Sequence, residues 1–291
     1  MKAPAFDYVR PRSLAEALAL LRRHGDDAKV LAGGQSLVPA LNLRLLAPKL
    51  LVDIGGLSEL KGIAVADGTV RIGALTRHVE LMRAPEIARH LPLIAAAMPH
   101  LSHAAIRNRG TLGGNLAHAD PASELPACCL ALGARMTIAG PDGERQVEAE
   151  AFFTGIFETA LRPDEILVRV DIPAVGADES CAFLELARRS GDYALVGVAA
   201  QGAVRDGGLS RLRLAFFSVG PTAMLARRAA AALEDRPITE AVLAEAQGAL
   251  AEDLAPQDDL QASAATRLHL ARVLLRRAVH ALVPGAAEKA A

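Results

Sequence analysis

The chain has 291 residues and a formal net charge of -1, with 52% hydrophobic and 22% charged residues. This length suits two domains and a sizeable core, and the even charge balance gives no electrostatic case for binding nucleic acid or a membrane surface. No apolar run approaches the roughly 20 residues of a membrane-spanning helix, and the N-terminus lacks the apolar segment of a secretory signal, so we expect a soluble, cytoplasmic protein.

Helices and strands alternate in the first 100 residues. Ser13 and Glu16 match a capping box at the start of a helix that ends at Gly25. Thr76 can cap a second helix, and Pro85 can open a longer one that continues to residue 98. Short apolar strands are expected at residues 29–32, 50–54 and 70–74.

The middle of the chain adds a helix and two strands. The helix is expected at residues 125–132 and the first strand at 135–139, followed by a hairpin turn at 141–144. Residues 165–172 alternate between apolar and polar side chains, as in a strand that is buried on one face, and Pro173 ends this strand.

The last third of the chain changes character, from strands to helices. Strands are expected at residues 182–188, 196–205 and 209–219. Asp206, Gly207 and Gly208 form a hairpin signal between the last two strands. Helices are expected at residues 223–233, 238–250 and 264–282. Three strands followed by three helices predict a separate α+β unit.

Two glycine-rich stretches, at residues 31–39 and 111–126, stand out from the rest of the chain. Each carries adjacent glycines, which allow backbone N–H groups to turn inward with no Cβ in the way. Concave runs of N–H groups bind phosphate oxygens, so the two stretches could hold two parts of one long anionic cofactor. The alternative for either stretch alone is an ordinary tight turn.

Two arginines and three histidines lie close to these stretches. Arg107 and Arg109 could balance the charge of a pyrophosphate, or they could be solvated loop residues. His78, His103 and His118 have no serine or cysteine partner in a recognisable nucleophile motif. We interpret these histidines as structural residues or as neighbours of a cofactor rather than as catalytic bases.

The three cysteines are Cys128, Cys129 and Cys181, and none forms a C-x-x-C pair. This spacing predicts no zinc or iron–sulfur site in the chain. The first two lie in an apolar run and are expected to be small buried hydrophobic residues.

Three segments resemble motifs of the flavin-binding medium subunit of molybdenum hydroxylases, the family that includes carbon monoxide dehydrogenase and xanthine dehydrogenase. The segments are Ala-Gly-Gly-Gln-Ser at 32–36, residues 109–115 with 119–122, and residues 188–196. The resemblance implies an α+β fold of the vanillyl-alcohol-oxidase (PCMH) type that binds FAD. It divides the chain into an FAD-binding domain at 1–176, with lobes 1–56 and 57–176, a C-terminal domain at 177–285, and a tail at 286–291.

The resemblance also implies which residues bind FAD. The first two segments would grip the pyrophosphate, one further residue would contact the adenine side, and three others would contact the flavin or the ribityl chain. The implied residues are Ala32, Gly33, Gly34, Gln35, Ser36, Leu37, Thr111, Leu112, Gly113, Gly114, Asn115, Asp120, Glu124, Leu167 and Tyr193. No catalytic side chain and no metal ligand is implied in this chain.

Three of these assignments have simpler alternatives. Asp120 could be the residue of an Asp-Pro turn, Glu124 could be a first-turn acid that the helix dipole stabilises, and Tyr193 could be an ordinary half-buried aromatic residue.

The function implied by the resemblance is electron transfer within a heterotrimer, and we expect a dimer of such trimers. A large partner would carry a molybdenum–pterin cofactor, and a small partner would carry two [2Fe–2S] clusters. Electrons would pass from these clusters through the FAD to NAD, a quinone or oxygen. Two alternatives stay open: a self-sufficient FAD oxidoreductase that acts on its own organic substrate, and a subunit without cofactor that only supports assembly.

Overall fold

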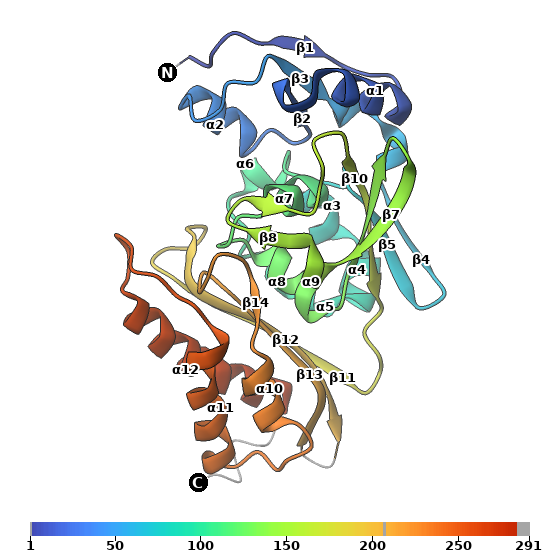
Figure 1. The fold of residues 1–291 in the computed structure, drawn as a ribbon. Helices are drawn as coiled ribbons and strands as arrows, with labels where there is room; N and C mark the ends of the chain where they lie inside the picture. The colour runs from blue at the N-terminus through green and yellow to red at the C-terminus, as the bar shows by residue number, and fades with distance from the viewer. Residues whose placement is uncertain (1, 206–207, 284–291) are drawn as a thin grey trace.

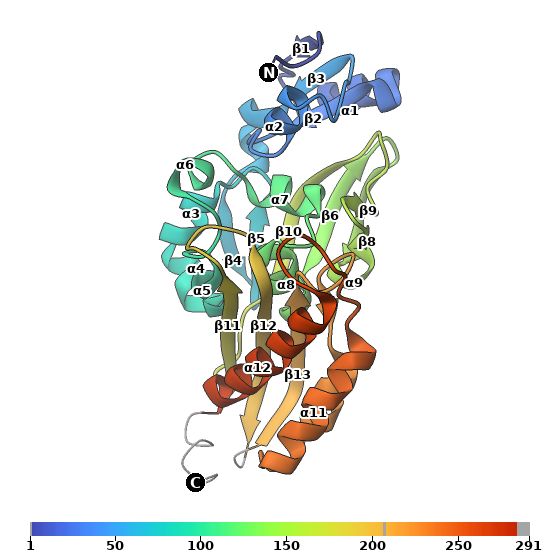
Figure 2. The same ribbon diagram turned by 90° about the vertical axis from the view of Figure 1, so that its left-hand side faces the viewer.

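The computed structural model describes residues 2–205 and 208–283, and it has the expected α+β architecture (Figure 1). The three larger sheets follow one another along the chain and lie in the same order from one end of the molecule to the other (Figures 1 and 2). The predicted turn residues Asp206 and Gly207 and the tail at 286–291 lie outside the described residues. None of the described helices is long and apolar enough to cross a membrane.

The N-terminal lobe is a three-stranded parallel sheet, in the order β1-β3-β2, against which α1 packs. The Ser13 hydroxyl accepts a hydrogen bond from the Glu16 amide, and Gly25 ends α1 with a φ of 52°, as the sequence predicted. Ala17 and Leu21 of α1 are buried. The elements are β1 (Asp7–Val9), α1 (Leu14–His24), β2 (Ala28–Leu31), α2 (Leu37–Asn42) and β3 (Leu50–Asp53).

The central lobe contains a five-stranded antiparallel sheet in the order β4-β5-β10-β6-β7 and a two-stranded β8-β9 pair. Its strands are β4 (Ile63–Ala66), β5 (Thr69–Gly73), β6 (Arg135–Gly140), β7 (Gly143–Glu148), β8 (Phe153–Gly155), β9 (Glu158–Thr159) and β10 (Ile166–Pro173). Its helices are α3 (His78–Arg83), α4 (Pro85–His90), α5 (Pro92–Ala97), α6 (Ala104–Arg107), α7 (Leu112–His118), α8 (Glu124–Ala131) and α9 (Ala149–Phe152).

Strand β10 is the middle strand of this sheet, and the prediction that only one of its faces is buried was wrong. Ile166 and Val168 pack into the core of the N-terminal lobe, whereas Val170 and Ile172 pack into the central core. A β-bulge between Leu167 and residue 169 shifts the register and turns the later apolar side chains to the other face. One strand therefore joins two hydrophobic cores.

Two predictions for the helices of the central lobe were also wrong. The helix expected from Pro85 to residue 98 is broken at Leu91, whose backbone is not helical (φ -132°, ψ 59°) because Pro92 disfavours the α conformation of the residue before it. Thr76 caps no helix. Its hydroxyl instead bonds to the backbone of Gly62, and α3 begins at His78.

The C-terminal unit is an antiparallel sheet in the order β11-β12-β13-β14, and the fourth strand was not expected. Residues 224–225, predicted as the start of a helix, instead pair with β13 at the sheet edge. Helices α10 to α12 cover one face of this sheet, and α5 and α8 of the central lobe lie against the other (Figures 1 and 2). The elements are β11 (Glu179–Ala187), β12 (Ala194–Arg205), β13 (Gly208–Phe217), β14 (Met224–Leu225), α10 (Arg227–Leu233), α11 (Glu240–Asp253) and α12 (Ala264–Leu282).

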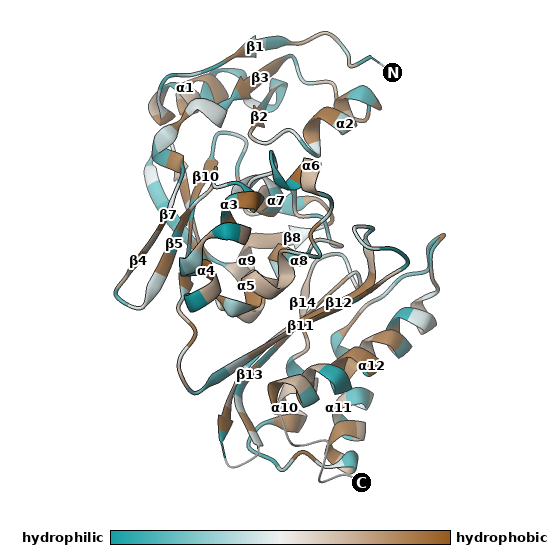
Figure 3. Cartoon of the chain, turned by 180° about the vertical axis from the view of Figure 1, so that it is seen from behind, coloured by the Kyte–Doolittle hydropathy of each residue, from teal (hydrophilic) through white to brown (hydrophobic). Residues whose placement is uncertain are grey.

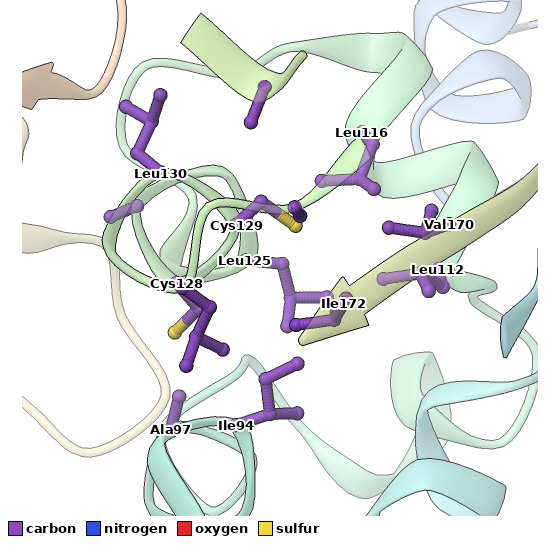
Figure 4. Close-up of a cluster of buried hydrophobic side chains, with 14 of the residues drawn as sticks. Ile94, Ala97, Leu112, Leu116, Leu125, Cys128, Cys129, Leu130, Val170 and Ile172 are labelled. Carbon is purple, nitrogen blue, oxygen red and sulfur yellow. The ribbon is translucent and has the colours of Figure 1, made fainter. Parts of the chain in front are cut away.

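The central core contains both cysteines of α8, as the sequence predicted. Apolar residues run along much of β10 and β12 (Figure 3). Figure 4 shows Cys128 and Cys129 among the leucine and isoleucine side chains of α5, α7, α8 and β10. Both thiols are fully buried and unpaired, and burial raises the pKa of Cys129 to about 12.

A buried ion pair fixes the start of β10 against β7. The Glu165 side chain is 1% exposed and accepts hydrogen bonds from Arg145 Nε at 2.8 Å, from Arg145 Nη2 at 2.7 Å and from the Arg162 amide at 2.8 Å. These bonds, chiefly those from Arg145, lower the pKa of Glu165 to about 2.

We predict that Glu165→Gln lowers the free energy of unfolding at pH 7 by about 2 kcal/mol, because it removes charge-assisted hydrogen bonds. A carboxyl whose pKa is lowered on folding stabilises the folded protein at pH values above its pKa in the unfolded state. This stabilisation is lost as the pH falls through the pKa of the carboxyl in the folded state. The difference between the two proteins should therefore shrink from pH 5 towards pH 2. Urea unfolding measures it, and Glu144→Gln, at an exposed position of β7, is the control. A constant difference down to pH 2 would contradict the prediction.

Candidate functional site

The two glycine-rich stretches meet where the N-terminal and central lobes touch. A Cβ on Gly33 would lie 2.4 Å from the backbone oxygen of Arg109 and 2.8 Å from Cα of Gly110. A Cβ on Gly114 would lie 3.8 Å from Cβ of Ala32. Only glycine allows the approach at position 33, since such short distances do not occur for real Cβ atoms. Two segments about 80 residues apart in sequence thus form one surface.

The first segment presents backbone donors without partners. Among the described residues, no acceptor bonds to the amides of Gly34, Gln35 or Ser36. Gly34 has a φ of 71°, and its carbonyl accepts from the amide of Val38, in the first turn of α2. The Ser36 hydroxyl makes no capping bond to α2. Three successive amides and one hydroxyl are the donor set that an anionic oxygen requires.

The second segment differs from the expected glycine turn, because residues 112–118 form helix α7. The Leu112 amide donates to Thr76 at 2.9 Å, the Gly113 amide to Ala74 at 2.8 Å, and the Gly114 amide to the Thr111 hydroxyl at 3.1 Å. These amides are therefore not free to bind phosphate, which corrects the expectation of a second concave run of N–H groups. Gly113 is needed for packing instead, since its Cβ would lie 2.5 Å from that of Ala74.

A hydrogen bond connects α7 to the start of α8. Nδ2 of Asn115 lies 2.8 Å from Oγ of Ser123, and Oδ1 of Asn115 lies 3.0 Å from the same oxygen. Ser123 immediately precedes Glu124, the first residue of α8. The Asn115 amide is thereby fixed to the residue that precedes α8.

Asp120, Glu124 and Tyr193 come together beside this connection. Glu124 is buried, and loss of solvation raises the pKa of its carboxyl to about 7 in spite of its place at a helix start. Tyr193 is 62% exposed, but partial loss of solvation and the nearby charge of Asp120 raise its pKa to about 12. Oδ1 of Asp120 accepts from the Ala122 amide at 2.9 Å, the geometry of an Asx turn.

Leu37 and Leu167 differ in their surroundings. Leu37 is the first residue of α2 and is partly exposed next to the free amides. Leu167 is 4% exposed and belongs to the central hydrophobic core. The structure therefore does not group the Leu167 side chain with the other candidates, and an adenine contact at this position stays a prediction.

The three histidines differ in their surroundings. His78 is buried, neither ring nitrogen has a partner among the described residues, and loss of solvation lowers its pKa to about 4. The His118 ring lies 4.9 Å from that of Phe157, and His103 lies against Gly191.

Arg107 and Arg109 have different surroundings. Arg107 donates to the carbonyls of Leu101 and Ser102 at 2.9 and 2.7 Å, so it holds the loop before α6. Arg109 is exposed, and its guanidinium has no partner within residues 2–205 and 208–283. Of the pair, Arg109 has the guanidinium without a partner among the described residues.

Sequence reasoning missed Glu185, which lies close to Glu124, and its partner His100. Glu185 of β11 is near enough for its charge to raise the pKa of Glu124, and its Oε1 lies 3.2 Å from Nδ1 of His100. Glu185 interrupts a run of apolar residues in a predicted strand, and that interruption was the only signal available for it.

Two family models together cover almost the whole described chain. Residues 4–175 match the FAD binding domain in molybdopterin dehydrogenase, and residues 181–282 match the CO dehydrogenase flavoprotein C-terminal domain.

Individual relatives match over nearly their full length. The chain is 41% identical to the 6-hydroxypseudooxynicotine dehydrogenase complex subunit alpha of Paenarthrobacter nicotinovorans, covering 95% of this chain and 94% of that protein. It is 39% identical to the caffeine dehydrogenase subunit beta of a Pseudomonas species, covering 96% and 95%. A solved chain of carbon monoxide dehydrogenase from Hydrogenophaga pseudoflava has a TM-score of 0.95 at 38% identity, covering 97% and 98%.

We predict that Gly33→Ala separates the two segments, because its Cβ would collide with the backbone of Arg109. The expected results are a loss of about 1–3 kcal/mol in the free energy of unfolding and FAD binding that is weaker by on the order of tenfold. Thermal unfolding and titration with FAD, followed by absorbance, measure the two effects.

The matched control is Gly248→Ala in α11, where nothing lies within 4 Å of the added carbon. This variant should stabilise the helix by about 0.5–1 kcal/mol and leave FAD binding unchanged. Unaltered FAD affinity in Gly33→Ala would show that the contact between the segments does not support the site.

Proposed function

The chain belongs to the FAD-binding medium subunits of molybdenum hydroxylases, and from this we propose that it carries electrons through FAD between partner subunits and an external acceptor. FAD is the cofactor of this chain's first family domain. Electrons would arrive from two [2Fe–2S] clusters in a small partner and leave to NAD, a quinone or oxygen.

The observation that carries this proposal is the row of three unpaired amides at residues 34–36 beside the exposed Arg109. The two phosphates of FAD carry negative charge, and amides, a hydroxyl and one guanidinium can solvate them. In this arrangement, Gly34, Gln35 and Ser36 hold the pyrophosphate, and Gly33 lets their segment lie against residues 109–110.

The remaining candidates would orient the other end of the cofactor. Tyr193 offers an exposed ring next to Asp120, and a ring placed flat against a flavin contributes about 1 kcal/mol beyond its area burial. Asp120 and the buried Glu124 can hydrogen-bond polar ring or ribityl atoms. Bound FAD stores two electrons, and the role of this chain is to hold it, set its surroundings and limit the access of water.

The partners in this proposal are a small iron–sulfur subunit and a large molybdenum–pterin subunit, arranged as a dimer of heterotrimers. Its support is that relatives which match over nearly their full length are themselves named as subunits, medium chains or parts of a dehydrogenase complex. The substrate would be selected in the large subunit.

We predict that the chain, expressed with its neighbouring subunits, purifies with FAD, iron and molybdenum. Metal analysis and the visible spectrum before and after release of the cofactor measure the three components.

Expressing the chain with and without its partners separates the alternatives. An isolated chain that binds FAD and turns over an organic substrate without partners would favour the self-sufficient oxidoreductase. A chain that binds no FAD when FAD is in excess, even in the assembly, would favour a purely structural subunit and overturn the proposal.

A further inference from the structure

Two carboxyl groups are buried where the central lobe meets the C-terminal sheet. Glu124 begins α8 and is 8% exposed, and the side chain of Glu185, on β11, is 7% exposed. Helix α8 packs on the C-terminal sheet from the side opposite to α10–α12 (Figure 1). Neither carboxyl forms an ion pair with a lysine or arginine of the described residues. Two adjacent buried carboxylates without a cation are unstable as a doubly charged pair.

The partners of Glu185 leave one oxygen unsatisfied. Its Oε1 lies 3.2 Å from His100 Nδ1, whereas its Oε2 is buried and has no partner within the described residues. A buried carboxylate oxygen without a donor costs free energy that a proton would recover. The His100 side chain is 44% exposed and its ring lies 5.3 Å from that of Phe183, so it connects Glu185 to solvent.

The surroundings of the two carboxyls are mostly acidic or neutral. Burial raises the pKa of Glu185, and His100 opposes that shift. Burial also raises the pKa of Glu124, and the charges of Glu185 and Asp120 add to the shift. The titratable groups that face the pair come from α8, β11 and the loops before α6, α8 and β12, and they are His100, Asp120, Cys128, Cys181 and Tyr193.

We propose that Glu124, Glu185 and His100 form a proton-holding cluster that takes up one proton from solvent when two electrons reach the FAD. The proposal rests on the function proposed above. Iron–sulfur clusters deliver electrons without protons, so two electrons on the FAD, less any proton that the flavin itself binds, would add negative charge beside Tyr193 and Asp120. The proton leaves a solvent water, whose O–H bond breaks, passes His100 and forms one O–H bond on the Glu124 carboxylate. It returns to solvent when the two electrons leave to the acceptor.

The pH range in which reduction takes up a proton follows from the pKa of Glu124. With the cofactor oxidised, the pKa of Glu124 is raised to about 7, and added negative charge nearby raises it further. Below pH 7 the carboxyl is protonated in both redox states, so reduction takes up no proton there. Proton uptake on reduction should therefore begin above pH 7. It should end at the higher pH where the Glu124 carboxyl is deprotonated in the reduced protein as well.

The test is the midpoint potential of the bound FAD, measured by spectroelectrochemistry from pH 6 to pH 9 on the protein with its subunits. One proton per two electrons adds about 30 mV per pH unit to the slope. We expect the wild-type slope above pH 7 to exceed that of Glu124→Gln by this amount. Glu185→Gln should move the start of the steeper region to lower pH, since it removes a neighbouring charge.

The control is Glu245→Gln on the surface of α11, which should follow the wild type. A second measurement, the infrared difference between reduced and oxidised protein at pH 8, should show a protonated carboxyl that is absent in Glu124→Gln. Equal slopes in the wild type and Glu124→Gln, with no carboxyl band, would overturn the proposal. Failure to bind FAD would instead count against the proposed function, and the visible spectrum detects that separately.

Discussion

The site depends on one close backbone contact, between Gly33 and the peptide of Arg109 and Gly110. It brings the loop after β2 against the segment before α7, and thereby joins two lobes that have separate sheets. Strand β10 also joins the two lobes, since some of its side chains pack into the N-terminal core and others into the central core. The Gly33 contact and strand β10 together hold the two lobes against each other. The free amides of residues 34–36 therefore keep a fixed orientation.

The electrostatics of the site change along its length. Near the N-terminal lobe, uncompensated N–H groups and Arg109 create a positive potential suited to phosphates. Near the C-terminal sheet, Asp120, Glu124 and Glu185 create an acidic region, and no lysine or arginine of the described residues forms an ion pair with them. A long cofactor with an anionic middle and a neutral ring system matches this gradient, whereas a small anion would use only one end.

The local features of this fold could be predicted from the sequence, but those that depend on distant residues could not. Ser13 and Gly25 bound α1 because a cap acts within one helical turn. Pro92 also indicates the break at Leu91 in the sequence, although the predicted helix continued through it. The bulge in β10 depends on its neighbouring strands, and the amides of Leu112 and Gly113 are bound by carbonyls about 40 residues earlier. His100 and Glu185 lie still farther apart in the sequence, which hid their contact, whereas the glycine motifs identified the two stretches that meet.

The burial of the α8 thiols has a consequence for the chemistry of the folded protein. Flavins that react with oxygen can release peroxide, and thiolates are the form of cysteine that peroxide oxidises. Burial keeps Cys128 and Cys129 protonated and out of contact with solvent. The chain therefore places its adjacent cysteines where oxidants from the cofactor cannot reach them, and their modification becomes a sensitive indicator that the central core has opened.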